Sequence, residues 1–517
     1  MQLNRRTAPP AVVCFHRCDG KGIARDKDEW LTMTHPIIGW ERETPVPDGH
    51  RFNDYLHVVQ GELHFGGVNL AQLFLKDRNA VEGPAFPGIG KSLPSPLEIV
   101  YLPKIRERIA AMQAFFAQAR AELGYAGQFH YAYASKANAA EEVIRTTLGA
   151  GANHEMSSVV DVAIAFLMIE RGLLTPDRFV ICNGFKAAGT DYAQSILNLR
   201  RAHERLIPVI EDLGELPPLV SSEQRFQVGL RHKTYGPHAD AAEMDAYDSR
   251  FGLDNEMLWR AASYVTAAPN LTLRLYHGMV GSQLTDPEEF IRRLTPPLEM
   301  FARLRQRYPS LSIFNFGGGM PAPMTLDFDF DYLDFVRRLL RTSQEICDRY
   351  GVPVPDIMGE FGRYTTTEHG AHLFKVITVK ENNSPYPWYI IDGSIMTSFP
   401  DSWALGEHFI VLPLTHLDKP FQRVQLGGLT CDSDDIYPPK HSHSPLYLPV
   451  ETDDLYLGFF GIGAYQEMLG GVRGSKHCVL PESDELIVDQ DENGRYHFER
   501  VGGQSFDEVL RNLGFIK

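Results

Sequence analysis

The stretch with the strongest chemical character is Tyr131–Asn138, in which Lys136 ends an apolar segment. Residues 129–134 are predicted to form a buried strand, and a helix is expected to begin near Ala139. Burial disfavours the charged form of an amine, so we expect a lowered pKa and a more reactive nucleophile at Lys136. Such a lysine can form a Schiff base with an aldehyde. A surface lysine that follows a strand is the alternative interpretation.

Three other segments could bind a phosphorylated ring. The run Gly317-Gly318-Gly319 exposes backbone N–H groups and allows a phosphate to approach closely. Ser282 could add a hydroxyl group, and Arg363 could bind two phosphate oxygens. Glu360 lies three residues before Arg363 and could accept a hydrogen bond from a protonated ring nitrogen. Together with a reactive lysine, these groups indicate pyridoxal 5′-phosphate as the cofactor.

Apolar strands alternate with helical segments from about residue 97 to residue 363. About eight strands end in polar or glycine-rich turns, and helices such as Asp161–Arg171 and Phe330–Tyr350 lie between them. This pattern predicts a (β/α)₈ barrel of the TIM type, whose active site lies at the C-terminal ends of its strands. Taken singly, each polar strand-end residue could be a helix cap or a structural ion pair, as for Ser158, Glu211 and Arg231.

The pattern of predicted elements changes after Arg363, where strands follow one another without helices of equal length between them. We expect a mostly antiparallel β domain there. The predicted organisation is an N-terminal segment over 1–94 that partly contributes to the β domain, a cofactor-binding barrel over 95–370 and the β domain over 371–517.

Composition restricts the function classes. The chain has 517 residues and a formal net charge of -16, which argues against a nucleic acid or an anionic membrane as partner. Six scattered cysteines do not form a disulfide framework, so a reducing cytoplasm is expected. Cys14, His16 and Cys18 suggest a metal site, but no second ligand pair follows and no metal is predicted. We find no signal peptide, and the apolar run Val159–Ile169 is too short for a membrane span.

Five ordered motifs lie between about Leu97 and Pro481, namely Tyr133-Ala-Ser-Lys136-Ala-Asn138, Gly317-Gly318-Gly319, Glu360-Phe-Gly-Arg363-Tyr364, Thr430-Cys431-Asp432-Ser433 and Gly463-Ala-Tyr465. They resemble the motifs of the fold-type III pyridoxal-phosphate-dependent decarboxylases, which have an alanine-racemase-like barrel followed by a β domain. Within that group, five segments are most similar to biosynthetic arginine decarboxylases: residues 181–186, 209–216, 398–404, 431–434 and 463–470.

The sequence departs from the arginine decarboxylase pattern at several motif positions. Ser135 precedes the lysine where an isoleucine is usual, and Phe361 and Asp435 are also atypical. Met279 stands where the family usually has a histidine that stacks on the cofactor ring, while His277 lies nearby. These departures concern the substrate more than the cofactor.

The resemblance implies α-decarboxylation of an amino acid, with arginine or another basic amino acid as the best candidate. It implies that Cys431 protonates Cα, that Asp432 binds the distal cationic group, and that both enter the active site of a partner in a homodimer. The candidate catalytic residues are therefore Lys136 and Cys431. The candidate cofactor-binding residues are Lys136, Glu155, His277, Ser282, Gly317, Gly318, Gly319, Glu360, Arg363 and Tyr465.

Several alternatives stay open. The substrate could be ornithine, lysine, diaminopimelate or a specialised metabolite, of either hand. An amino-acid racemase on the same fold is opposed by Glu360, because racemases of this type usually place an arginine at the ring nitrogen. A non-catalytic regulator is opposed by the presence of Lys136.

Overall fold

The computed structural model describes residues 35–75, 92–234, 249–381, 384–471 and 476–517. Cys14, His16 and Cys18 lie outside the described residues. Within these ranges, no helix combines the length and the apolar character needed to cross a bilayer.

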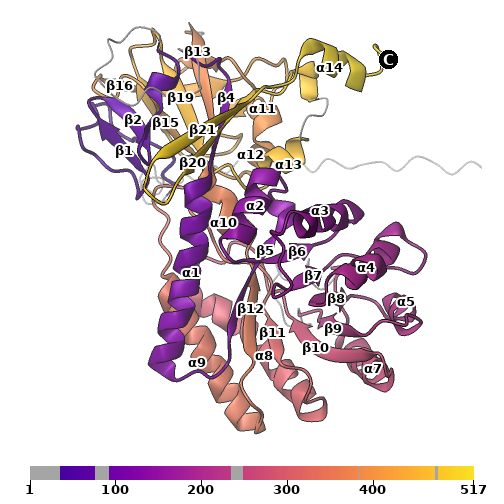
Figure 1. Ribbon diagram of the computed structural model, residues 1–517. Coiled ribbons are helices and arrows are strands. Elements are labelled where there is room, and N and C mark those ends of the chain that lie inside the picture. Colours follow the sequence, from indigo (N-terminus) through magenta and orange to yellow (C-terminus); the bar gives the residue numbers. More distant parts are fainter. Residues whose placement is uncertain (1–34, 76–91, 235–248, 382–383, 472–475) are drawn as a thin grey trace, which may run out of the picture. The chain divides into compact units, whose positions relative to one another are not determined.

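Eight parallel strands close into a barrel in chain order, with the last strand hydrogen-bonded to the first (Figure 1). The predicted (β/α)₈ barrel is confirmed. Strands such as β8 are apolar throughout because both faces of a parallel barrel strand are buried. The strands are β5 (Phe129–Ala134), β6 (Asn153–Met156), β7 (Val180–Cys182), β8 (Leu206–Ile210), β9 (Phe226–Arg231), β10 (Leu271–His277), β11 (Ile313–Asn315) and β12 (Asp356–Glu360).

Amphipathic helices surround the barrel and bury one face against it. In α9, Phe335, Leu339 and Ile346 recur at helical spacing and are buried, while Asp331 caps the first turn. The barrel helices are α1 (Leu102–Leu123), α2 (Glu141–Gly149), α3 (Val159–Glu170), α4 (Asp191–Ala202), α5 (Leu216–Val220), α7 (Asn255–Ala267), α8 (Pro287–Arg307) and α9 (Tyr332–Tyr350), with the 3₁₀ turns η3 (Ser135–Ala137) and η4 (Leu213–Glu215).

A second sheet of ten strands forms the other domain, and most of its strand pairs are antiparallel, as predicted. Two pairs are parallel, β14 with β16 and β20 with β4. The strands are β4 (Leu97–Tyr101), β13 (Gly370–Lys380), β14 (Trp388–Ile391), β15 (Ile410–Pro413), β16 (Phe421–Gly427), β17 (Ile436–Tyr437), β18 (Leu446–Pro449), β19 (Tyr456–Phe460), β20 (Asp484–Gln490) and β21 (Tyr496–Val501).

Short elements complete this domain. A three-stranded N-terminal sheet shares its apolar core with the ten-stranded sheet. The remaining elements are β1 (Leu56–Val59), β2 (Glu62–Phe65), β3 (Val68–Asn69), η2 (Ala71–Leu73), α10 (Arg363–Thr366), η5 (Thr367–His369), α11 (Ile395–Ser398), α12 (Pro400–Leu405), α13 (Gln466–Gly470), η6 (His477–Val479) and α14 (Phe506–Asn512).

The chain passes between the domains twice, and both passages hold the site in place. Strand β4 lies within the range predicted for the barrel but pairs with β13 and β20, and it runs directly into α1. After β12 the chain returns through α10 and η5 to β13. Buried Lys104 of α1 lies 4.0 Å from Glu368 of η5, and Arg108 of α1 lies 3.2 Å from the same carboxylate. These contacts join the start of α1 to the segment that follows Arg363.

Candidate active site

A cavity of about 770 Å³ opens at the C-terminal ends of the barrel strands. Barrel residues line most of it, and Tyr465 from the β domain closes one side. Among the predicted residues, it brings together Lys136, Glu155, His277, Ser282, Gly318, Gly319, Glu360, Arg363 and Tyr465. Gly317 adjoins them in the same turn.

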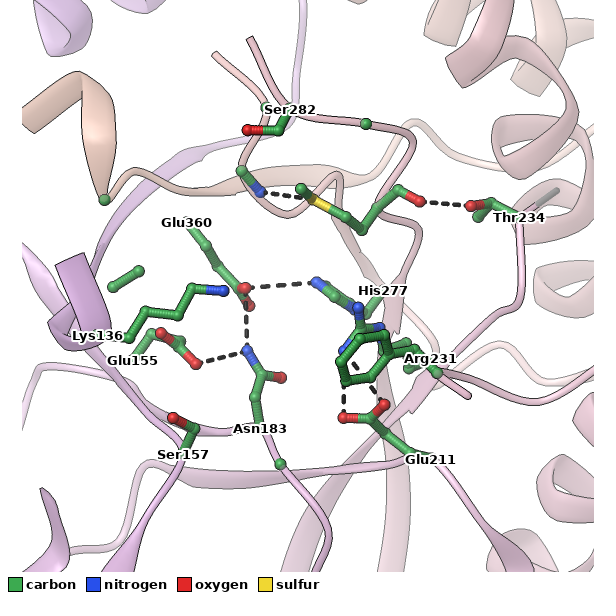
Figure 2. A pocket seen from close by; sticks show the side chains of 18 of the residues that line it. Lys136, Glu155, Ser157, Asn183, Glu211, Arg231, Thr234, His277, Ser282 and Glu360 are labelled. Atoms are coloured by element: carbon green, nitrogen blue, oxygen red, sulfur yellow. Dashed lines mark hydrogen bonds and ion pairs between the residues drawn. The ribbon is translucent and has the colours of Figure 1, made fainter. Parts of the chain in front are cut away.

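Lys136 projects into this cavity from the 3₁₀ turn η3, directly after β5, and points toward Glu360 (Figure 2). Burial by itself would lower the pKa of the amine. At the high pH at which a lysine loses its proton, the ionised forms of Glu155, Tyr465 and Glu360 outweigh that effect and raise the pKa of Lys136 above its usual value. The expected lowering is therefore wrong for the cofactor-free chain, in which Lys136 is an ammonium ion.

Two buried carboxyl groups face the lysine, and one amide joins them. Asn183 Nδ2 donates to Glu155 Oε1 at 2.8 Å and to Glu360 Oε2 at 3.0 Å. Asn315 Nδ2 donates to Glu360 Oε1 at 2.6 Å, and His277 Nε2 lies 3.4 Å from Glu360 Oε2. Figure 2 shows Glu155, Asn183, Glu360 and His277 beside Lys136.

The environment separates the pKa values of these two acids. Burial favours the neutral form of Glu360, but His277, Asn315 and Lys136 stabilise its anion and lower its pKa to about 2. Burial and the neighbouring Glu360 charge raise the pKa of Glu155 to about 8. At neutral pH the site therefore holds an ionised Glu360 beside a protonated Glu155.

Glycines line another part of the cavity. Gly319 has φ +93°, and a Cβ there would lie 2.6 Å from the Gly281 carbonyl oxygen, so no side chain fits. The Arg363 guanidinium lies 4.9 Å from the ring centroid of Tyr465. The backbone of Tyr465 is strained, with a φ of 69°. Ser282 also lines this part. The region thus combines close backbone approach with a cation and two hydroxyl groups.

Cys431 and Asp432 lie away from the cavity of their own chain, in the loop after β16. Cys431 is exposed, and Asp432 Oδ2 lies 3.3 Å from His477 Nε2. Asp435 is buried beneath them and accepts hydrogen bonds from Thr430 N and Thr430 Oγ1. The atypical Asp435 therefore holds the loop in shape.

Sequence reasoning assigned no role to Asn183 and Asn315, although both stand at strand ends. Asn183 directly follows β7, and Asn315 is the last residue of β11. Their position at strand ends is the feature of the sequence that could have identified them. Glu211 and Arg231, left open between a structural and a functional role, form an ion pair at 3.1 Å on the cavity wall. Ser158 caps α3 instead.

The structure shows which of His277 and Met279 faces Glu360. His277 ends β10 and faces Glu360. The Met279 sulfur instead accepts the Gly318 N–H, in the glycine-lined part of the cavity. The imidazole beside the carboxyl groups therefore belongs to His277. This residue stands two positions before Met279, which occupies the place where the family usually has a histidine.

Known proteins resemble this chain over most of its length. The family model described as "Pyridoxal-dependent decarboxylase, pyridoxal binding domain" matches residues 104–367. The biosynthetic arginine decarboxylase of Bacteroides thetaiotaomicron is 23% identical, over 81% of this chain and 84% of that protein. Arginine decarboxylase 1 of Oryza sativa is 24% identical, over 86% of this chain and 77% of that protein.

Solved structures share the fold. The biosynthetic arginine decarboxylase of Campylobacter jejuni superposes with a TM-score of 0.70 at 20% identity, covering 89% of each chain. Diaminopimelate decarboxylase from M. jannaschii, in complex with L-lysine, gives a TM-score of 0.71 at 19% identity, covering 89% of this chain and 98% of that chain.

Proposed function

The chain belongs to the pyridoxal-dependent decarboxylases, and we propose that it removes the α-carboxylate of a basic amino acid, with arginine as the best candidate. The observation that carries this proposal is that Lys136, an ionised Glu360 and a turn of three glycines meet in one cavity.

The cavity fits pyridoxal 5′-phosphate. Five buried polar atoms of its lining residues have no hydrogen-bond partner among the described residues, namely Glu155 Oε2, Asn183 Oδ1, His277 Nδ1 and Nε2, and Arg363 Nε. Buried polar atoms of this kind are normally satisfied, so they mark places where a ligand can bind. When bound, the cofactor supplies an aldehyde that links to amines and a ring that accepts the electron pair left by departing CO₂.

The protein's own groups then have separate tasks. Lys136 would hold the aldehyde carbon and return to it after each turnover. Glu360 would hold a proton on the ring nitrogen, and its low pKa keeps it anionic for that purpose. Ser282, Arg363, Tyr465 and the glycine amides would bind the phosphate.

The remaining chemistry requires a second chain. A decarboxylase must return a proton to the substrate Cα, and Cys431 is our candidate donor. Because Cys431 is exposed and does not line the cavity of its own chain, we propose a homodimer. In it, Cys431 and Asp432 of each chain complete the site of the other, with Asp432 receiving the distal cation of the substrate.

A thiol can donate a proton only while it is reduced. The four cysteines in the described ranges, Cys182, Cys347, Cys431 and Cys478, are all free. We therefore propose a reducing compartment, the cytoplasm, as the location of the enzyme.

A second candidate substrate is a diamino acid that carries a distal carboxylate, such as diaminopimelate. It is favoured by the cationic part of the cavity wall. Arg250 lines the cavity, and its guanidinium lies 4.3 Å from the ring centroid of Phe251. Arg231 also lies 4.5 Å from this ring, but Glu211 already pairs with its guanidinium. A guanidinium on an aromatic face, as at Arg250, keeps its N–H edge available for a carboxylate.

A product screen tests both candidates. Purified protein with added cofactor is incubated with single enantiomers of arginine, ornithine, lysine and diaminopimelate, and CO₂ and amine are measured. We expect one-to-one release of CO₂ and agmatine from arginine, and none from the Lys136→Ala variant. Release from diaminopimelate instead would select the second candidate. Formation of the mirror-image amino acid without CO₂ would refute decarboxylation.

A further inference from the structure

Met279 lies against the glycine turn that is proposed to bind the cofactor phosphate. Its Sδ atom accepts a hydrogen bond from Gly318 N at 3.2 Å. A Cβ placed on Gly317 would lie 2.8 Å from the same sulfur, so the thioether packs directly on the turn. Figure 2 shows the sulfur contact as a dashed line.

This contact occupies a donor that an anion would use. Gly317 N is already bound by Asn315 Oδ1 at 2.8 Å. Of the first two amides of the turn, Gly318 N is therefore the one that a phosphate oxygen could take, and the Met279 sulfur holds it. A thioether is a weak hydrogen-bond acceptor, whereas a phosphate oxygen is a strong one. A phosphate can displace the sulfur, at the cost of one weak hydrogen bond.

The local structure allows this exchange without moving the backbone. Thr234 Oγ1 donates to the carbonyl oxygen of Met279, which anchors the main chain of the loop. The Met279 side chain is unbranched and rotates about three bonds. It is only half-buried and adjoins the open cavity, so the sulfur can leave Gly318 while the loop stays in place.

We propose that Met279 is a built-in competitor for phosphate at the glycine turn, and that it lowers the affinity of this turn for phosphate-bearing ligands. The proposal rests on the proposed function for its ligand, pyridoxal phosphate. It assigns Met279 a role in cofactor affinity and none as a support for the cofactor ring.

The test compares dissociation constants for three probes on the full-length protein freed of cofactor. The probes are pyridoxal 5′-phosphate, inorganic phosphate and pyridoxal, which lacks the phosphate. Met279→Leu keeps the side-chain volume but removes the sulfur acceptor, and Met279→Ala removes both. Met320→Leu is the matched control, because Met320 lines the same cavity and no hydrogen bond to its sulfur is found among the described residues.

We expect Met279→Leu to bind pyridoxal phosphate and inorganic phosphate about threefold to tenfold more tightly than the wild type, the effect of one hydrogen bond. Met279→Ala should gain at least as much. Pyridoxal affinity should not change, and Met320→Leu should match the wild type for every probe.

Unchanged or weaker phosphate binding in Met279→Leu would overturn the proposal, and so would an equal gain for pyridoxal. Weaker binding of both pyridoxal forms would instead indicate a ring support. If the wild type does not bind pyridoxal phosphate at all, the proposed function fails, while the inorganic phosphate titration still decides the role of Met279.

Discussion

The barrel face and the loop after β16 both carry predicted site residues, but in opposite environments. On the barrel face, Lys136, Glu155 and Glu360 share one cavity with Asn183, which donates a hydrogen bond to each of the two carboxyl groups. In the loop, Cys431 is exposed and Asp432 contacts only the exposed His477 among the described charged groups. One chain therefore brings together the residues proposed to bind the cofactor, and the residues proposed to act on the substrate need a second chain.

The largest effect is expected at the covalent anchor of the barrel half. Lys136→Ala should lose at least about a thousandfold in turnover, because the amine nucleophile is gone. It should also lose the absorbance band of the lysine-linked cofactor, while the free cofactor spectrum remains. Lys136→Arg is the charge-matched control, and it should fail equally. Wild-type turnover in either variant would exclude Lys136 as the anchor.

The carboxylate array should give the next largest effect. Glu360→Gln removes the anion that would keep the ring nitrogen protonated, so kcat should fall about a hundredfold. The cofactor should still bind through Lys136 and the glycine turn, and its dissociation constant should change little. A large loss of cofactor affinity with unchanged kcat would place Glu360 in binding alone. Kinetics and a cofactor titration on the same preparation separate the two results.

A mixing experiment tests the division between the two halves. Lys136→Ala and Cys431→Ala should each be nearly inactive. Mixed and re-equilibrated in equal amounts, they should recover about a quarter of wild-type activity, because half of the dimers are mixed and each mixed dimer has one intact site. Cys478→Ala is the control, since Cys478 is the other exposed cysteine among the described residues, and it should be active alone.

Differential tagging of the two variants would demonstrate that mixed dimers form. If they form and no activity is recovered, Cys431 does not complete the partner's site. The loop after β16 would then lose its proposed role, and the barrel half would have to supply its own proton donor. Glu155 would be the candidate, because its raised pKa keeps it protonated at neutral pH.

The barrel could be predicted because its signal is local: apolar strands, polar strand ends and intervening helices repeat along the chain. The pairing of β4 with the second sheet could not be predicted, because the strands that pair with β4 are distant from it in the sequence. The predicted lowering of the Lys136 pKa was wrong for the same reason, because the groups that raise it, Glu155, Tyr465 and Glu360, come from other elements of the chain. Asn183 escaped attention because a neutral amide belongs to no charge pattern.

The smallest effect concerns Glu155 and the pH dependence of stability. Its pKa in the folded protein is about 8, above the ordinary value of 4.5. The folded state therefore binds this proton more tightly than the unfolded state. The resulting stability is fully present below pH 4.5 and is lost as pH rises toward 8. Glu155→Gln should abolish that loss, so the melting temperature of the cofactor-free variant should vary less over this range.

The control for this titration is Glu122→Gln. Glu122 is exposed and paired with Arg337, which lowers its pKa to about 2, so its titration falls outside the range. Melting curves of the wild type and both variants between pH 4.5 and 8 give the comparison. If Glu155→Gln and the wild type lose stability in parallel, Glu155 is already ionised at neutral pH. The barrel half would then hold two anions opposite Lys136, and a protonated Glu155 could not replace Cys431 as a donor.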